Sequence, residues 1–254
     1  EPHACLSYWD PYTGGLVHQS AKQSPYFTYR QLGAFFRIPL NKVRLVQPLV
    51  GAGFGGKNAP YPLDFYAPML ARKTGKPVKM VFSQEEVLTS CWRKGTNRVT
   101  MRTGWKKDGT LMAMEGKMLA DGGAFSAIGP VSMWLSCNYL TLPFKLPAIK
   151  WESKRVYTNY ITSVAMQGHG IDHTRFAAEC QMDMVAEELG LDPVEIRLKN
   201  AVPNEQYETV NGLKIYTCGI KECTEKVAQT VNWKERKKQL KEERNSSKGP
   251  VRRG

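Results

Sequence analysis

The chain has 254 residues, of which 42% are hydrophobic and 23% are charged, and its formal net charge is +13. A chain of this length can bury the core of one large or two small domains, and the composition is that of a globular protein. No apolar run reaches the roughly 18 residues that a membrane helix needs, so we expect no membrane association.

The basic residues gather near the end of the sequence. Residues 233–254 hold nine Lys or Arg against three Glu, a net charge of +6. Such a tail is more often a solvated linker than a binding face, and no nucleic-acid-binding motif accompanies it. We therefore expect no nucleic-acid partner, and we expect the segment from Trp233 onward to be extended or poorly ordered.

The six cysteines are scattered and contain no C-x-x-C pair. This usage predicts reduced thiols in a cytoplasmic protein and neither a zinc nor an iron–sulfur site in this chain. The sequence opens on Glu1 without a methionine, so we expect a fragment or a processed product.

The first predicted elements are two strands of a hairpin, residues 4–8 and 16–20, joined by a segment rich in turn-forming residues. Gln23 follows the second strand, and Pro25 keeps the preceding residue extended. A glutamine at a strand end is more often solvated than functional, so it is only a candidate. A short helix over residues 29–37 comes next.

The stretch Val50-Gly51-Ala52-Gly53-Phe54-Gly55-Gly56-Lys57 is the most informative part of the chain. Glycine is needed where the backbone takes positive φ or where another group approaches closely. The sequence predicts a buried strand over residues 42–50 before the loop and a helix over 63–73 after it, closed by Gly75. A loop in this position presents backbone N–H groups to an anionic ligand.

Nucleotide binding is the simplest alternative for this loop. Its glycines fit G-x-G-x-x-G, and Gly51, Gly56 and Lys57 fit G-x-x-x-x-G-K. However, Asn58 stands where a phosphate-binding loop has Ser or Thr, and two prolines separate the loop from the helix. A lone match of this kind is weak evidence.

Two alternating stretches, residues 98–105 and 110–121, surround a Lys-Lys-Asp-Gly turn and predict a long hairpin. We interpret the methionines at 112, 114 and 118 as core packing. A short helix over residues 131–140 and a strand over 154–158 follow.

The second glycine-flanked turn, Met166-Gln167-Gly168-His169-Gly170, precedes a helix predicted over residues 173–189. We expect this helix to have Phe176, Cys180, Met184 and Leu189 near one face. Asp192 and Pro193 are typical of the start of a further helix, which ends near residue 200. A last helix is predicted over residues 221–231.

Six stretches, taken in order, resemble one family. They are EPHA, AKQSP, VGAGFGGK, KKDGTLMAMEGKMLADGGAFSAIGP, MQGHG and FAAECQMDMVAEELGLDPVEIRLKNA. Together they resemble the first molybdopterin-binding domain of the large subunit in the xanthine dehydrogenase and aldehyde oxidase family of molybdenum hydroxylases. The resemblance covers residues 1–201, and residues 202–254 resemble a helix and charged linker, ending in Arg252-Arg253-Gly254, that lead to a second domain absent from this chain.

The resemblance implies a fold and a set of cofactor-binding residues. The fold is α+β, with mixed β-sheets and peripheral helices, and the two glycine turns should converge at one edge. Gln23 is similar to a glutamine that hydrogen-bonds a molybdenum oxo ligand, and no residue of the chain ligates the metal directly. The implied cofactor-binding residues are Gln23, Gly53, Phe54, Gly55, Gly56, Gln167 and Gly168.

Three positions of the implied substrate pocket depart from the xanthine-oxidising pattern. Asn58 replaces a glutamate, Leu135 lies near the place of an arginine, and His169 replaces a phenylalanine. These changes argue against xanthine, and the G-H-G turn is more similar to hydroxybenzoyl-CoA reductase members. Gln167 also stands where an arginine is common.

The family's activity is hydroxylation, or its reductive reversal, of an aromatic, heteroaromatic or aldehyde substrate. The implied cofactor is molybdenum-molybdopterin, including its dinucleotide form, whereas iron–sulfur and FAD groups belong to partner domains or subunits. The catalytic glutamate belongs to the missing second domain, so this chain alone should be an incomplete oxidoreductase. The implied substrate is a small aromatic compound or a CoA thioester. A nucleotide-binding domain and a noncatalytic remnant stay open as alternatives.

Overall fold

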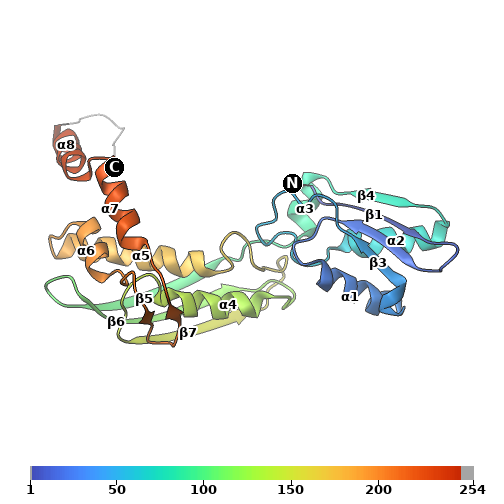
Figure 1. Ribbon diagram of the computed structural model, residues 1–254, viewed down its shortest axis with the longest axis horizontal. Coiled ribbons are helices and arrows are strands. Elements are labelled where there is room, and N and C mark those ends of the chain that lie inside the picture. The colour runs from blue at the N-terminus through green and yellow to red at the C-terminus, as the bar shows by residue number, and fades with distance from the viewer. Residues whose placement is uncertain (1, 247–254) are drawn as a thin grey trace. The chain divides into compact units, whose positions relative to one another are not determined.

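The computed structural model describes residues 2–246, and Figure 1 labels most of the helices and strands. The described residues divide into two compact units. Unit 1 comprises residues 2–98, 118–136 and 153–173, and unit 2 comprises residues 99–117, 137–152 and 174–246. No helix in this part of the chain combines the length and hydropathy needed to span a membrane.

Unit 1 contains a four-stranded sheet in the order β3-β2-β1-β4. The predicted hairpin is present, with β1 (Ala4–Trp9) antiparallel to β2 (Leu16–Ser20). Strand β3 (Val43–Val46) is parallel to β2, and β4 (Val78–Val81) is antiparallel to β1. This mixed sheet agrees with the predicted α+β class and differs from the all-parallel sheet of a doubly wound fold.

Three helices accompany this sheet. They are α1 (Pro25–Phe36), α2 (Pro62–Thr74) and α3 (Gln84–Ser90). Buried Leu63 and Ala67 of α2 pack with Cys5 of β1 in one apolar cluster, and Leu32 of α1 packs with Leu16 and Val43 in another. Both α1 and α2 begin with proline, whose fixed φ suits the first helical turn.

The strand predicted over residues 42–50 is shorter than expected. Strand β3 ends at Val46, two residues before Pro48. Proline has no N–H to donate to a strand ladder, so the segment leaves the sheet there and continues as the glycine loop. The predicted helix after the loop is confirmed, and Gly75 closes it in the left-handed conformation at φ 66°.

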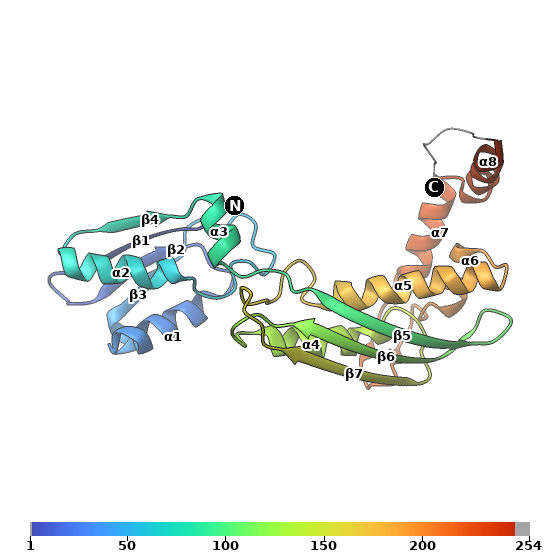
Figure 2. The same cartoon turned by 180° about the vertical axis from the view of Figure 1, so that it is seen from behind.

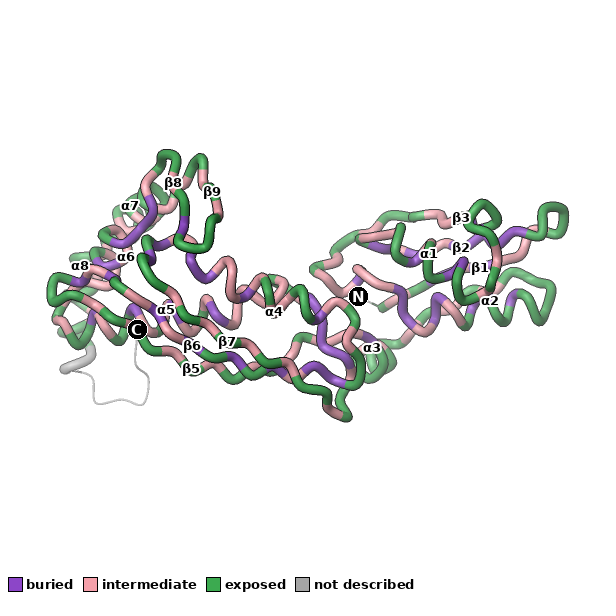
Figure 3. Tube along the Cα trace, turned by 90° about the horizontal axis from the view of Figure 1, so that it is seen from below, coloured by how far each residue is buried: buried purple, intermediate pink, exposed green. Residues whose placement is uncertain are grey.

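The second sheet has three strands in the order β5-β6-β7. Strands β5 (Asn97–Trp105) and β6 (Leu111–Asp121) confirm the two predicted stretches, and β7 (Ile149–Val156) begins five residues before the strand predicted there. Burial alternates along β6, as Figure 3 shows by colour. Met114 and Met118 are buried as expected for core residues, whereas Met112 is 38% exposed.

Helix α5 (Ile171–Glu188) covers the core of unit 2 (Figure 2). Its Ala178 and Met182 pack with Leu111 and Met114 of β6. The face with Phe176 and Met184 is not the one that packs on the sheet, because these side chains are 73% and 64% exposed. Apart from Met182, the buried residues of α5 are the small Thr174, Ala178 and Ala186.

The remaining elements are short. They are η1 (Leu40–Lys42), α4 (Gly129–Asn138), η2 (Tyr139–Thr141), α6 (Pro193–Asn200), β8 (Tyr207–Glu208), β9 (Lys214–Ile215) and α7 (Ile220–Thr230). The predicted cap of α6 is present, since Asp192 Oδ1 accepts a hydrogen bond from the N–H of Val194 at 2.8 Å.

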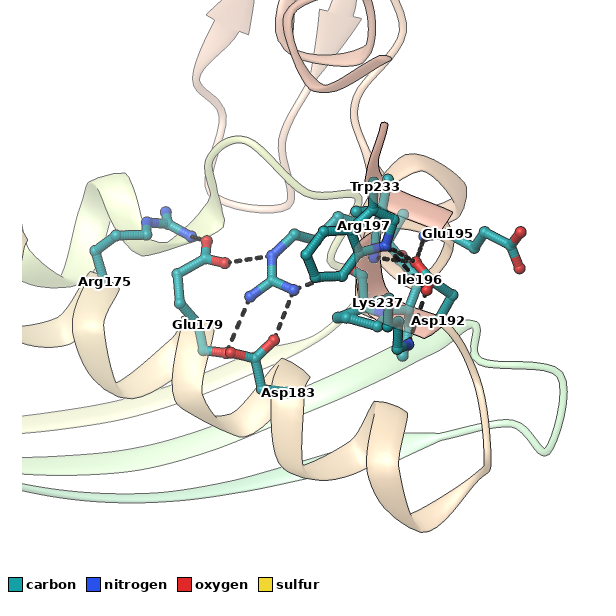
Figure 4. Close-up of polar contacts among 12 residues, drawn as sticks. Arg175, Glu179, Asp183, Asp192, Glu195, Ile196, Arg197, Trp233 and Lys237 are labelled. Atoms are coloured by element: carbon teal, nitrogen blue, oxygen red, sulfur yellow. Dashed lines mark hydrogen bonds and ion pairs between the residues drawn. The ribbon is translucent and has the colours of Figure 1, made fainter. Parts of the chain in front are cut away.

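The segment from Trp233 is helical and docked, so the expectation of an extended or disordered tail is wrong for residues 233–246. Helix α8 (Trp233–Ser246) begins with Trp233, whose Nε1 donates to Asp192 Oδ2 at 3.0 Å. Lys237 Nζ donates to the same oxygen at 2.8 Å (Figure 4). The hydrogen bonds from Trp233 and Lys237 to the Asp192 carboxylate therefore hold a helix that has few apolar side chains for packing. Arg252-Arg253-Gly254 lies outside the described residues.

Candidate functional site

The glycine loop connects β3 to α2 without regular secondary structure over residues 47–53. Within it, the N–H of Gly56 donates to Gly53 O at 2.7 Å, and the N–H of Asn58 donates to Gly55 O at 3.2 Å. These two hydrogen bonds fold residues 53–58 into consecutive tight turns.

Gln23 holds the glycine loop from the end of the neighbouring hairpin. Its Oε1 accepts hydrogen bonds from the N–H groups of Gly55 at 2.8 Å and Lys57 at 3.1 Å, and its own N–H donates to Lys57 O at 2.7 Å. A Cβ on Gly53 would lie 2.5 Å from the Gln23 side chain, so glycine at position 53 leaves the space that this side chain occupies. Because Oε1 is the acceptor, Nε2 is left as a donor, and it has no hydrogen-bond partner among residues 2–246.

The two glycine turns meet, as predicted. The N–H of Gln167 donates to Phe54 O at 2.9 Å. A Cβ on Gly55 would lie 2.1 Å from Ala165 O, closer than any real contact. The approach of the backbones therefore depends on glycine at position 55.

Backbone strain is concentrated at the same place. Phe54, Gln167 and His169 have φ values of 48°, 47° and 55°, in the left-handed region that side chains other than glycine seldom adopt. Gly168 and Gly170 also have positive φ, so four successive residues share this conformation. Strained backbone of this kind is found most often at ligand sites.

The three residues predicted for the substrate pocket lie on separate elements. Asn58 Oδ1 accepts a hydrogen bond from Ser24 Oγ at 2.5 Å. His169 Nδ1 lies 3.3 Å from Ser132 Oγ of α4, the helix that also carries half-buried Leu135. The structure thus brings His169 and α4 together and holds Asn58 beside the segment of Gln23.

Lys57 does not extend toward a ligand. Its side chain is buried, and its Nζ donates to Val50 O at 2.5 Å, which closes the loop on itself. In a phosphate-binding loop the corresponding lysine reaches the phosphates. The orientation of Lys57 therefore argues against the nucleotide alternative.

Unit 1 also contains an apolar groove with a volume of about 820 Å³. Its lining includes Ala59, the residue that follows Asn58 in the sequence. None of its lining residues, all of them in the described part of unit 1, is Asp, Glu, Lys or Arg. Its aromatic lining includes Phe27, Phe35, Tyr61, Phe65, Trp92 and Phe125. Sequence reasoning missed the groove, because these aromatics are scattered over the first half of the chain without a repeating spacing.

A buried polar cluster was also missed. It joins Asp64 of α2 to His18 and Ser20 of β2 and to Lys22, which follows that strand. The only local signal was Asp64 in the first turn of a proline-started helix, which is typical of a capping residue.

His3 lies beside this cluster, and its pKa is lowered by its surroundings. Its ring is 4.2 Å from the Tyr61 ring, centroid to centroid. Burial, and then the charges of Lys22 and Lys57, lower the pKa of His3 from 6.5 to about 4, against a smaller opposing effect of Asp64. The imidazole is therefore neutral in the folded chain at neutral pH.

We expect the free energy of unfolding to fall as the pH is lowered from about 6.5 to about 4. Within this window the unfolded chain binds a proton at His3 and the folded chain does not, so stability rises with pH. Urea unfolding of this chain at several pH values measures the effect, and His3→Gln is the comparison. If both proteins show the same pH dependence above pH 4, His3 does not carry it.

Residues 1–201 match the family described as the molybdopterin cofactor-binding domain. The nicotinate dehydrogenase large molybdopterin subunit of Eubacterium barkeri is 34% identical over 201 residues, which are 79% of this chain and 47% of that protein. The xanthine dehydrogenase molybdenum-binding subunit of Escherichia coli O157:H7 is 31% identical over 235 residues, 92% of this chain and 31% of that protein.

Solved structures show the same relationship. Quinoline 2-oxidoreductase of Pseudomonas putida 86 superposes with a TM-score of 0.88 at 25% identity, over 96% of this chain and 32% of that chain. This chain therefore spans less than half the length of each of these three relatives.

Proposed function

Because the chain belongs to the molybdopterin cofactor-binding family of molybdenum hydroxylase large subunits, we propose that it is the first cofactor-binding part of such a subunit. Residues 1–201 would form this domain, and residues 202–254 would lead to a second one. The complete enzyme would be a molybdenum-dependent oxidoreductase, and this chain alone would lack half of the cofactor site.

One observation carries the proposal, namely that Gln23 fixes the glycine loop and the loop meets the turn of residues 166–170. The residues there suit molybdopterin, which offers anionic and oxo oxygens. Gln23 Nε2 is a donor without a partner in the described chain, and the glycines expose backbone where a Cβ would intrude. The residues that would hold the cofactor are Gln23, Gly53, Phe54, Gly55, Gly56, Gln167 and Gly168.

When bound, the cofactor supplies two-electron oxidation or reduction of an electron-poor carbon. The chain's residues would position it. Gln23 would donate a hydrogen bond from Nε2 to a cofactor oxygen, and its Oε1 would keep the loop in register through Gly55 and Lys57. Phe54, which is 65% exposed, would exclude water from one side of the site.

The rest of the machinery would lie outside this chain. The general base would come from a second molybdopterin domain or chain, and iron–sulfur and flavin subunits would carry the electrons. Two of the named relatives are themselves called subunits, which supports a multisubunit enzyme.

The uncharged groove supports a small, uncharged aromatic, heteroaromatic or aldehyde substrate. Pockets of this volume suit small molecules, and their polar groups decide specificity. A CoA thioester carries several phosphate charges, and the groove lining offers no Lys or Arg to pair with them. Xanthine is disfavoured by Asn58, Leu135 and His169, the residues predicted for the substrate pocket, because none of them supplies a carboxylate or a guanidinium. These three residues do not line the groove itself.

The molybdenum and pterin content of the chain, purified from its native source with the proteins that accompany it, tests the proposal. We expect near-stoichiometric molybdenum together with further subunits. A folded chain that carries neither molybdenum nor pterin would be a remnant, and bound adenine nucleotide would favour the nucleotide-binding alternative.

We expect Gln23→Ala to lower molybdenum content and activity of this complex at least about tenfold, because one lost hydrogen bond to a charged group costs roughly 1.5–3 kcal/mol. The matched control is Gln229→Ala, at an exposed position of α7 in unit 2. Circular dichroism checks that both variants fold. Full activity and metal content in the folded Gln23→Ala complex would refute the site.

A further inference from the structure

Asp64 is the centre of a buried polar cluster that the proposed function does not use. Its side chain is fully buried. Oδ1 accepts from Ser20 Oγ at 2.7 Å and lies 3.1 Å from His18 Nε2. Oδ2 accepts from Lys22 Nζ at 2.6 Å and from the N–H of Tyr61 at 2.7 Å. Each carboxylate oxygen thus has two partners.

The charge state of this cluster follows from its contacts. Burial by itself would raise the pKa of Asp64, but the hydrogen bonds and charges of His18 and Lys22 outweigh burial and lower that pKa. Asp64 is therefore a carboxylate, paired with a lysine that is itself 1% exposed. The Lys22 ammonium also lies 4.7 Å from the centre of the Tyr61 ring.

The spacing of the donors explains how the cluster reaches the loop. His18, Ser20 and Lys22 alternate along an extended segment, so their side chains share one face. The next residue, Gln23, turns to the other side and accepts from the glycine loop. Pairing of Lys22 with Asp64 thus fixes the chain immediately before Gln23.

The same carboxylate fixes the far end of the loop. Tyr61 N–H is bonded to Asp64, and Tyr61 comes four residues after Lys57, whose N–H and C=O both bond to Gln23. Asp64 therefore anchors both segments that meet at Gln23. A purely local helix cap would hold only Tyr61.

A metal ion is the other reading of Cys5, His18 and Asp64, whose ligand atoms lie within 4.8 Å of one another. However, Lys22 already places a cation against Asp64. Cys5 Sγ donates to Leu63 O at 3.4 Å, and burial raises the pKa of this thiol to about 12. A neutral thiol beside an ammonium group is a poor cation site.

We propose that Asp64 and Lys22 are positioning residues that hold Gln23 and the glycine loop in the geometry of the cofactor site. The use of this geometry to hold a cofactor rests on the proposed function. The positioning of Gln23 by Asp64 and Lys22 depends only on contacts within this chain.

Hydrogen exchange of the full chain tests the positioning directly. The N–H groups of Gly55 and Lys57 report it, because both donate to Gln23 Oε1. We expect Lys22→Met to speed their exchange at least tenfold relative to peptides of β6, and Lys22→Arg, which keeps the cation, to restore most of the protection. In the purified complex, molybdenum content should follow the same order.

A structural control separates positioning from general destabilisation. Leu32→Ala creates a cavity in the other apolar cluster of unit 1, which has none of the bonds to Asp64. We expect it to lower stability while Gly55 and Lys57 keep their protection relative to the rest of unit 1. Equal loosening of the loop in Leu32→Ala and Lys22→Met would overturn the proposal.

Two further outcomes are decisive. If Lys22→Met does not fold, Ser20→Ala removes one donor and leaves the ion pair, and a smaller but selective increase in exchange at Gly55 and Lys57 is expected. Unchanged exchange there overturns the proposal. Selective loosening in a complex whose wild type contains no molybdenum supports the positioning and refutes the proposed function.

Discussion

Gly55→Ala is expected to separate the two glycine turns. Gly55 has a φ of 91°, and an added Cβ would lie 2.1 Å from Ala165 O and 2.7 Å from its carbonyl carbon. Positive φ alone costs about 1–2 kcal/mol for a residue with a Cβ. The clash is with backbone and cannot be relieved by a rotamer change, so Ala165 must move and the bond from Gln167 N–H to Phe54 O is lost. We expect a fall of about 3 kcal/mol in the free energy of unfolding, since one lost hydrogen bond adds about 1 kcal/mol.

Gly212→Ala is the matched control for this substitution. Gly212 has a φ of 81°, and an added Cβ would have no atom within 4 Å. It therefore measures the cost of positive φ without the clash. Urea unfolding of both variants gives the difference, and hydrogen exchange at Gln167 reports the loop contact. Equal losses of stability, with Gln167 still protected, would show that the turns do not depend on close approach at Gly55.

Asn200→Ala is expected to destabilise unit 2 by about 3 kcal/mol, because each buried polar group left unpaired costs roughly 1–3 kcal/mol. Asn200 is 2% exposed and joins the end of α6 to the turn between β5 and β6. Its Oδ1 accepts from Leu111 N–H at 2.8 Å, and its Nδ2 donates to Gly109 O and Ile196 O, both at 2.8 Å. Alanine would leave the Leu111 N–H and the Gly109 carbonyl without these partners.

The same turn provides a control on its exposed side. Lys199 Nζ lies 3.0 Å from Asp108 Oδ2, and the two side chains are 41% and 59% exposed. Asp108→Asn should therefore cost less than about 1 kcal/mol. Denaturant unfolding of the two variants compares them. Asn200→Asp, which would bury a carboxylate against the carbonyl oxygens of Gly109 and Ile196, should cost at least as much as Asn200→Ala. A loss from Asn200→Ala as small as that from Asp108→Asn would contradict the role of Asn200 as a buried link.

The exposed face of α5 shows why a local pattern was not sufficient. Phe176, Cys180 and Met184 recur at helical spacing, and such spacing normally marks a buried face. The structure buries the side with Ala178 and Met182 instead. Periodicity identifies that a helix forms, but the choice between two moderately apolar sides depends on which one fits the neighbouring sheet. Here the side that fits carries the small residues Thr174, Ala178 and Ala186 beside Met182.

The docking of α8 has a similar cause. Residues 233–246 contain little apolar surface, so composition predicted no packing. Trp233 and Lys237 nevertheless share one acceptor, Asp192, which also caps α6 (Figure 4). A single carboxylate some forty residues away in the sequence cannot be recognised as a partner before the chain is folded.

The sequence by itself determined the elements whose signals are local. Proline, glycine and alternation marked the first hairpin, α2, the β5–β6 pair and α6, and the ordered motifs identified the family and both glycine turns. Only the tertiary structure decided which surfaces meet. It brought Phe54 to Gln167, turned Lys57 away from a ligand, and gathered His18, Ser20, Lys22 and Asp64 into one buried cluster. Local signals depend on backbone preferences within a few residues, whereas these contacts depend on burial and hydrogen-bond partners that only the folded chain brings together.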